Sequence, residues 1–258
     1  MKLLKIFSYV VVLIVCIMGA FFCGRNTVSP TKEELFHFNN MEILKCAVAK
    51  YDAKDGMYII MDAKTHEIAD TGFINSYKDH KIHSHNLRKL ITLIAGLNSG
   101  VFSIDDIVFN DDDVEYINKV SKQDKERVYN VLEFDNAKAS TWLLAYLNVV
   151  NNEGNLLTEE QSVAIRKALR ENVVSGPAKK TNVADAEVTG LGSTTQKQEN
   201  ENDVITMFVG TFKSKGKEYG IMTIMDSPHG IKETWNYNSA GWNAVPLARD
   251  LIKNYILE

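Results

Sequence analysis

The sequence predicts an α+β protein in which helices flank an antiparallel sheet, and three observations support this class. Two short apolar runs within residues 57–71 have the pattern of a β-hairpin, and the centre of the chain carries apolar residues at helical spacing. Strand-like runs return between residues 183 and 225, and an amphipathic helix closes the chain. This order is typical of an α+β layout whose strands come from both ends of the chain.

Composition restricts the class of protein. The chain has 258 residues, of which 45% are hydrophobic and 24% are charged, which suffices for one domain with a sizeable core. The net charge is −4 and no basic stripe is visible, which argues against nucleic acid as a partner. Cys16 and Cys23 lie in the apolar N-terminal stretch, so Cys46 is alone in the body of the chain. A disulfide framework is therefore excluded there, and we expect Cys46 to be a small buried residue.

The N-terminus predicts export. Lys2 and Lys5 precede an uncharged run from Ile6 to Gly24, which is long enough to cross a hydrocarbon core of about 30 Å. Because basic residues stay on the cytoplasmic side, we expect residues 1–24 to be a single-pass signal anchor in the cell membrane. The C-terminal domain would then be extracytoplasmic, either periplasmic or on the outer face.

Two other interpretations of the apolar run stay open. One is a signal peptide cleaved near Gly19-Ala20, although Met18 is large for such a site. The other is a lipoprotein anchor on Cys23, although Phe22 is bulky where a small residue is preferred.

A polar segment separates the anchor from the domain. We expect residues 25–51 to be a juxtamembrane linker with an amphipathic piece from Glu33 to Lys50, and residues 52–258 to be the domain. The first elements of the domain are a strand from Met57 to Met61, a polar turn, and a strand from Glu67 to Thr71.

Helices occupy the middle of the domain. Leu87 to Leu97 carries apolar residues at helical spacing, and Asn98-Ser99-Gly100 ends the run, so a largely buried helix is expected. Residues 105–126 are acidic and polar and should form loops. One or two further helices are predicted between Val128 and Asn148.

The last part of the chain returns to strands. Thr158 and Gln161 have the capping-box spacing of another helix, which Gly176-Pro177 ends. The remaining predicted elements are three strands and a closing helix, at Val183 to Thr189, Val204 to Phe212, Tyr219 to Met225 and Pro246 to Leu257.

Four stretches, in this order, carry a resemblance to a known family. "GMYIIMDAKTHEIADTG" is similar to an opening hairpin, and "NLRKLITLIAGLNSGVFSIDD" to a nucleophile helix. "LRENVVSGPAKKTNVADAEVTGLGSTTQ" is similar to the segment entering a Lys-Thr-Gly strand, and "MFVGTFKSKGKEYGIMTIMD" to the hairpin after it. Together they resemble the transpeptidase domain of class B, division-type penicillin-binding proteins, a fold shared with serine β-lactamases. The likeness covers residues 52–256 and implies that fold.

The chemistry of this family needs particular side chains. A serine hydroxyl attacks a D-Ala-D-Ala amide or a β-lactam carbonyl, and a lysine one helical turn later removes its proton. A Ser-x-Asn loop carries protons, and a Lys-Thr-Gly strand supplies a cation for the substrate carboxylate. The resemblance implies no cofactor and no metal.

The matching positions of the nucleophile helix carry an altered residue. Lys89 matches the family lysine, because Thr92 and the apolar run follow it as they do in the family. The nucleophile position, three residues earlier, is then Asn86, whose amide has no nucleophilic oxygen of the required kind. Ser84 is close, but no lysine faces it at helical spacing.

The other two motifs are altered as well. The Ser-x-Asn motif best matches Ser140-Thr141-Trp142, in which Trp142 replaces the amide. The Lys-Thr-Gly motif matches Val188-Thr189-Gly190, so the cation is lost, and Leu191 stands where threonine is usual. The interval from Ser140 to Val188 is shorter than the usual helical insert, which predicts a reduced helical subdomain.

These substitutions predict a non-catalytic relative. It would be an exported, membrane-anchored module of the cell envelope that acts in binding or scaffolding, with peptidoglycan or an envelope protein as partner. Two alternatives stay open. One is an active serine acyl-transfer enzyme, a penicillin-binding transpeptidase or carboxypeptidase, which requires Ser84 or Ser140 as nucleophile. The other is an unrelated exported α+β binding module.

Several residues also have simpler interpretations. Lys89, without its serine, could extend to solvent along the end of its helix. His80, His83 and His85 share one loop, which we expect to be solvated because no acidic or cysteine ligand is spaced with them.

An acidic cluster and two tryptophans of the predicted domain have simple interpretations too. Asp111-Asp112-Asp113 lacks the glycine and glutamate of an EF-hand and indicates an exposed turn. Trp235 and Trp242 would either line a groove for glycan or peptide, or pack a loop onto the sheet.

Overall fold

The computed structural model describes residues 31–75, 85–107, 109, 119–132, 139–196, 203–228 and 239–257, with the side chains of residues 85–87 left out. The predicted anchor, its two alternatives and several candidate positions lie outside these residues, namely 1–24, His80, His83, Ser84, Asp111 to Asp113, Trp235, and the side chains of His85 and Asn86. Within the described residues, no helix has the length and apolarity needed to cross a membrane.

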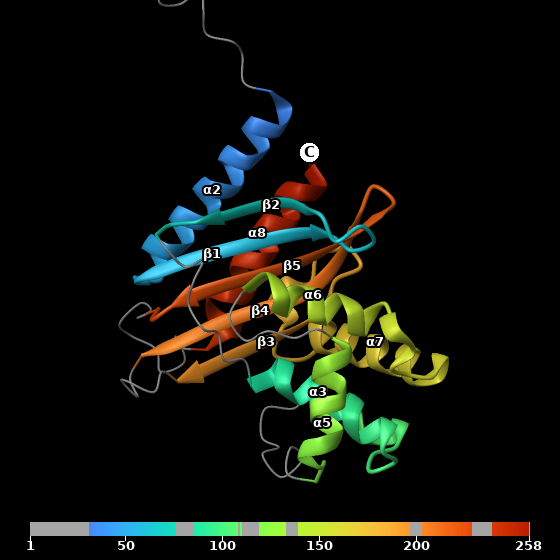
Figure 1. The fold of residues 1–258 in the computed structure, drawn as a ribbon. Helices are drawn as coiled ribbons and strands as arrows, with labels where there is room; N and C mark the ends of the chain where they lie inside the picture. The colour runs from blue at the N-terminus through green and yellow to red at the C-terminus, as the bar shows by residue number, and fades with distance from the viewer. Residues whose placement is uncertain are drawn as a thin grey trace, which may run out of the picture. The chain divides into compact units, whose positions relative to one another are not determined.

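The core of the protein is a five-stranded, fully antiparallel sheet with strand order β2-β1-β5-β4-β3. The strands span Asp55–Asp62 (β1), Ile68–Phe73 (β2), Thr189–Gln196 (β3), Val204–Ser214 (β4) and Lys217–Asp226 (β5). Because β1 pairs with β5, the predicted sheet built from both ends of the chain is confirmed (Figure 1).

Six helices surround this sheet in the described part of the chain. They span Lys32–Lys50 (α2), His85–Asn98 (α3), Lys122–Val131 (α5), Ala139–Val150 (α6), Glu159–Val174 (α7) and Ala244–Leu257 (α8). The predicted capping box of α7 is confirmed, since Thr158 Oγ1 accepts from Gln161 N and Gln161 Oε1 accepts from Thr158 N.

The tight turn between β4 and β5 follows from its sequence. Lys215 and Gly216 adopt φ angles of 51° and 77°, and Ser214 pairs with Lys217 across the turn. Two consecutive left-handed residues match the right-handed twist of a hairpin, and glycine adopts such a φ without steric cost. This turn fixes the register of the two central strands.

Alternating side chains of the strands face two separate apolar cores. On the α3 face of the sheet, residues such as Ile59 and Leu191 pack with α3, α5 and α6. On the α8 face, residues such as Tyr58 and Phe208 pack with α8 and with Leu44 of α2. The two-residue repeat of a strand therefore decides which helices each side chain meets.

Two predicted elements differ from the structure. Residues 183–188 form no strand, because their backbone closes local turns (Ala186 N to Val183 O, and Val188 N to Ala186 O), and β3 begins only at Thr189. The apolar side chains of this segment are buried although it is not a strand. The spacing of apolar residues in the sequence cannot distinguish a buried turn from a strand. The predicted loop over residues 105–126 is also too long, since α5 begins at Lys122 behind its cap Ser121.

The second part of α2 packs with the sheet. The compact unit that holds the sheet begins at His37, so it includes this part of the helix. Asn40 and Leu44 of this helix are fully buried. Cys46 is exposed, so the expectation of a buried cysteine is wrong; it lies on α2 away from the buried stripe.

Candidate functional site

The expected site lies where α3 meets the edge strand β3. The two elements are in contact, so the prediction that the helix of Lys89 packs against a sheet containing Thr189 is confirmed. Lys89 is 6% exposed, and the residues that follow it in the helix, Leu90 and Ile91, are fully buried. This burial contradicts the interpretation of Lys89 as a side chain that extends to solvent. Asn86 lies one helical turn before it, in the first turn of α3.

Helix α6 supplies the second predicted motif. Ser140 is half-buried at the start of the helix, and Trp142 is fully buried in the core of the α3 face. An indole at this place fills the core, and its only polar group is a single N–H donor. It therefore cannot substitute for an amide that both donates and accepts hydrogen bonds.

A chain of hydroxyl groups joins α6 to the sheet. Tyr146 Oη lies 3.2 Å from Thr189 Oγ1, which in turn lies 2.8 Å from Thr211 Oγ1 on β4. Burial raises the pKa of Tyr146 well above its usual range, against the opposing effect of the hydrogen bond to Thr189. The phenol therefore stays neutral and acts as a structural hydrogen-bonding group.

Val188, which the motif matches to the family lysine, lies on the α8 side of the sheet. It is fully buried and belongs to the core of the α8 face, with Phe208 and Leu251. This position therefore presents an aliphatic side chain and no cation.

The strand residue that faces α3 is Leu191. It is 2% exposed and packs in the same core as Leu90 and Ile91, which follow Lys89 on α3. Thr189 also faces this side, as its contact with Tyr146 shows. Because side chains alternate between the two faces of a strand, Thr189 and Leu191 lie on the opposite face from Val188 and Gly190. The sequence motif did not indicate which of the two faces meets α3.

Helix α7 holds the first part of β3 through two side chains that the sequence motifs did not single out. Arg170 donates to the carbonyl oxygen of Val188 at 2.7 Å, and Asn172 Nδ2 donates to that of Gly190 at 2.7 Å. Carbonyls two residues apart point to the same edge of a strand, so two donors on one helix can bind both. The amphipathic pattern of α7 predicted the helix but not these contacts.

The loop before α8 lies against the middle of β3. Ala240 N donates to Thr194 Oγ1 at 2.9 Å. Trp242, two residues further on, is 42% exposed, and the ammonium of Lys180 lies 3.2 Å above its ring centre. The loop of Trp242 therefore packs onto the sheet, which is one of its two expected roles, and the ring itself is covered by a cation. Burial and the nearby cations, Arg249 first among them, lower the pKa of Lys180.

No metal site is arranged among the side chains that the structure describes, since no three His, Cys, Asp or Glu residues come together there. The described candidate residues that do come together are Lys89, Trp142, Thr189 and Leu191, all on the α3 face. This set offers one cation and one hydroxyl, enclosed by apolar groups.

The fold is similar to solved transpeptidase domains. The transpeptidase domain of the FtsI4 D,D-transpeptidase from Legionella pneumophila aligns with a TM-score of 0.72 and 17% identity over 88% of this chain and 97% of that one. The corresponding domain of penicillin-binding protein 3 from Burkholderia pseudomallei gives 0.70 and 13% identity over 88% and 96%. Penicillin-binding protein 3 from Mycobacterium tuberculosis in complex with aztreonam gives 0.66 and 10% identity over 85% and 76%. No protein-family model and no curated protein matches the sequence.

Proposed function

We propose that this protein, which has the transpeptidase-domain fold of the penicillin-binding proteins, is a non-catalytic module of the cell envelope that binds peptidoglycan peptide without forming an acyl-enzyme. The fold alone does not carry this proposal, because function depends on the site. The proposal rests on the residues between α3 and β3.

The single observation that carries the proposal is the aliphatic character of the positions that would hold a substrate. Leu191, where the family usually has threonine, packs in the core with α3 and is 2% exposed. Val188, which matches the cation that would hold a substrate or drug carboxylate, is aliphatic as well. A charge-assisted hydrogen bond of that kind contributes about 1.5–3 kcal/mol, and an aliphatic side chain supplies none of it.

The nucleophile position supports the same conclusion. Acylation requires a hydroxyl or thiol within hydrogen-bonding distance of a base, and the residue one turn before Lys89 is Asn86. Lys89 stands at the position of the family base and is 6% exposed. Without a serine one turn before it, this lysine has no nucleophile from which to remove a proton.

Binding of an extended peptide is consistent with the position of β3. This strand forms one edge of the sheet, and extended peptides bind sheet edges by adding a strand. Arg170 and Asn172 bind the carbonyls of Val188 and Gly190, so α7 occupies that part of the edge. The partner that we propose for this side of the domain is an extended peptide, the stem peptide of peptidoglycan.

The test is covalent labelling with a fluorescent penicillin. The full chain in membranes should show no labelled band after denaturing electrophoresis, while the Legionella pneumophila transpeptidase domain, treated in parallel, serves as the labelling control. Intact mass measurement of the purified chain should show no adduct. A labelled peptide containing Ser84 or Ser140 would overturn the proposal and establish the active-enzyme alternative.

A second measurement tests binding itself. The full chain should sediment with purified peptidoglycan, and free stem peptide should compete for it. Sedimentation that stem peptide does not reduce would contradict binding of the peptide, and no sedimentation at all would overturn binding to peptidoglycan.

We also propose that residues 1–24 hold the protein in the membrane, on the basis of the uncharged run behind Lys2 and Lys5. Cell fractionation should recover the full-length chain with the membranes, and a protease added outside the cytoplasmic membrane should digest the domain. Recovery of a soluble chain without its first twenty or so residues would establish cleavage instead.

A further inference from the structure

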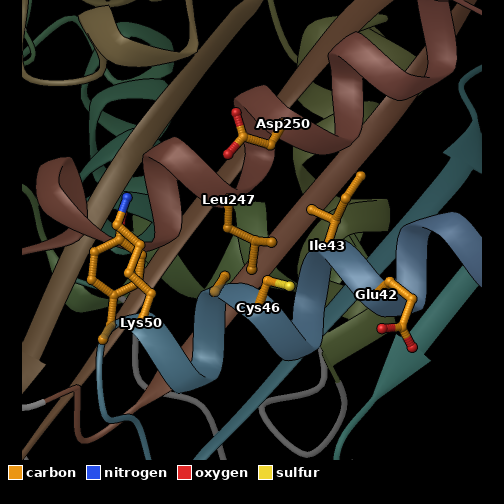
Figure 2. Close-up of a pocket in the computed structure, with 8 residues that line it drawn as sticks. Glu42, Ile43, Cys46, Lys50, Leu247 and Asp250 are labelled. Carbon is orange, nitrogen blue, oxygen red and sulfur yellow. The ribbon is translucent and has the colours of Figure 1, made fainter.

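A groove of about 390 Å³ runs along the surface between α2 and α8, on the opposite side of the sheet from the candidate site. Its floor and walls combine apolar and charged side chains (Figure 2). The residues are Glu42, Ile43, Cys46, Ala47, Lys50, Tyr51, Leu247 and Asp250. Nothing in the proposed function involves this surface.

Helix α2 carries two different stripes. One stripe packs on the sheet, with Asn40 and Leu44 fully buried and Val48 close to Gly56 of β1. The second stripe faces the groove and includes Ile43 and Ala47, both half-buried. Residues three and four apart share a helix face, so the second stripe is a continuous surface along the helix. Ile43 and Ala47 also pack against the core of the α8 face, and the part of their surface that stays exposed lines the groove.

Charge is arranged symmetrically along this second stripe. Glu42 and Lys50 lie four residues before and four residues after Cys46, and therefore one helical turn to either side of it. Figure 2 shows Glu42 and Lys50 at opposite ends of the groove, with Cys46 between them. An antiparallel second copy of α2, centred on Cys46, would place Glu42 of each chain opposite Lys50 of the other. A parallel copy would instead place like charges together.

We propose that this groove is the contact surface of a two-fold symmetric homodimer in which the α2 helices of two chains pack antiparallel across Cys46. Symmetric dimers use the same patch on both chains, which must be self-complementary, and this stripe is. The partner helix would cover Ile43 and Ala47, which the monomer leaves half-exposed. The inference is independent of the proposed peptide binding.

The contacts that these charges make within one chain do not compete strongly with the dimer. Glu42 pairs with Lys45 of the same helix at 2.7 Å, with both side chains about half exposed, and such surface pairs are weak. Lys50 lies 5.2 Å from the ring centre of Tyr51. Each can keep its local contact and accept a second partner across the dimer axis.

Cys46 reports the predicted geometry directly. The full chain carrying Cys16→Ser and Cys23→Ser retains a single thiol, and copper-phenanthroline oxidation in membranes should join two copies through Cys46. The matched control moves the thiol to α7, as Cys46→Ser with Lys167→Cys, a position that is 74% exposed. We expect the Cys46 disulfide to form about tenfold faster than the control, because the dimer raises the local concentration of the partner thiol.

Charge reversal tests the orientation. Glu42→Lys and Lys50→Glu should each lower the yield of the Cys46 disulfide about tenfold, because each places like charges opposite one another twice. The double variant should restore it, since both opposite-charge pairs return with reversed sign. Circular dichroism checks that each variant is folded.

Sedimentation of the detergent-solubilised full chain should give the mass of a dimer, and Glu42→Lys should give that of a monomer. A folded chain that sediments as a monomer would overturn the proposal. So would a Cys46 disulfide whose yield is unchanged by either reversal, or a double variant that does not recover.

Discussion

The hydroxyl group of Tyr146 on α6 lies 3.2 Å from that of Thr189, the first residue of β3. Thr189 also contacts the hydroxyl of Thr211 at 2.8 Å, so three buried hydroxyls connect a helix to two strands. This connection holds the beginning of the edge strand beside the helices of the α3 face. It lies next to the strand positions that a transpeptidase would use for its substrate.

Removing this connection should destabilise the fold in a graded manner. Tyr146→Phe leaves Thr189 bonded to Thr211 and should lower the free energy of unfolding by about 0.5–1.5 kcal/mol. Thr189→Val leaves both Tyr146 and Thr211 without this partner and should cost about 1–3 kcal/mol. Urea unfolding of both variants and of the double variant measures the coupling. Additive losses in the double variant would contradict a direct bond.

The two candidate positions for the lost cation can be separated by substitution. Asn86→Ser combined with Leu191→Lys should give weak labelling by fluorescent penicillin, because the new cation faces α3. Asn86→Ser combined with Val188→Lys should give none, because residue 188 faces the core of the α8 face. Labelling of the second pair and not of the first would show that the original alignment of the motif is right.

Both lysine substitutions should also cost stability. Val188 and Leu191 are 0% and 2% exposed, and a lysine ammonium is poorly solvated in either core, so each should lower the free energy of unfolding by several kcal/mol. Asn86→Ser alone should label poorly, since Leu191 still supplies no cation. Chemical denaturation of each variant, before labelling, distinguishes a lost fold from a lost contact.

Alkaline pH should destabilise the protein through Tyr58. Burial, then the charge of Asp70 and the hydrogen bond to it at 2.9 Å, hold the pKa of Tyr58 far above its usual range. Above pH of about 10 the unfolded chain loses this proton while the folded chain keeps it, so the free energy of unfolding falls by about 1.4 kcal/mol per pH unit. This contribution is fully present below pH of about 10.

Tyr58→Phe should remove that part of the slope. Denaturation measured between pH 9 and 11 would show a smaller fall for the variant, by about 1.4 kcal/mol over the whole range, because the slope approaches about 1.4 kcal/mol per pH unit only above pH of about 10. Tyr146→Phe should remove a similar part, because burial also raises the pKa of Tyr146. Equal slopes in the variant and the unaltered protein would contradict the assignment.

A pair of glycines opposite one another should be intolerant of side chains. Gly190 and Gly210 pair across β3 and β4, and a methyl group on Gly190 would lie 2.4 Å from the ring of Phe208. Gly190→Ala should therefore cost about 1–3 kcal/mol through overpacking. Gly192→Ala is the matched control, since its nearest neighbour would be Val245 at 3.3 Å. Thermal unfolding in which the two variants are equally destabilised would contradict this account.

Some elements could be predicted because their signals are local. The capping box at Thr158, the turn at Lys215-Gly216 and the apolar spacing of α3 each depend on residues within a few positions of one another. Their predicted elements agree with the structure to within a few residues. The resemblance to transpeptidase domains also concerned the order of such elements, and the fold confirms it.

Other expectations were wrong for reasons that the sequence does not contain. Val188 ends an apolar segment that has strand-like composition but forms turns, so the predicted strand begins several residues too early. Cys46 is a small apolar residue by type, yet it lies on the exposed stripe of α2. Whether a side chain is buried depends on which face of its element meets another element, and that contact is made by residues distant in the chain.

The sequence by itself determined the helices and strands of this protein, their order, and the absence of a serine one turn before Lys89, because each is a matter of local spacing and residue type. Only the tertiary structure decided that Leu191 and not Val188 faces α3, that Arg170 and Asn172 bind the edge of β3, and that α2 joins the domain with a second stripe exposed. The physical reason is the two-residue repeat of the strand. A shift of one residue moves a side chain to the opposite core, and only packing against α3 and α8 fixes which residues face which side.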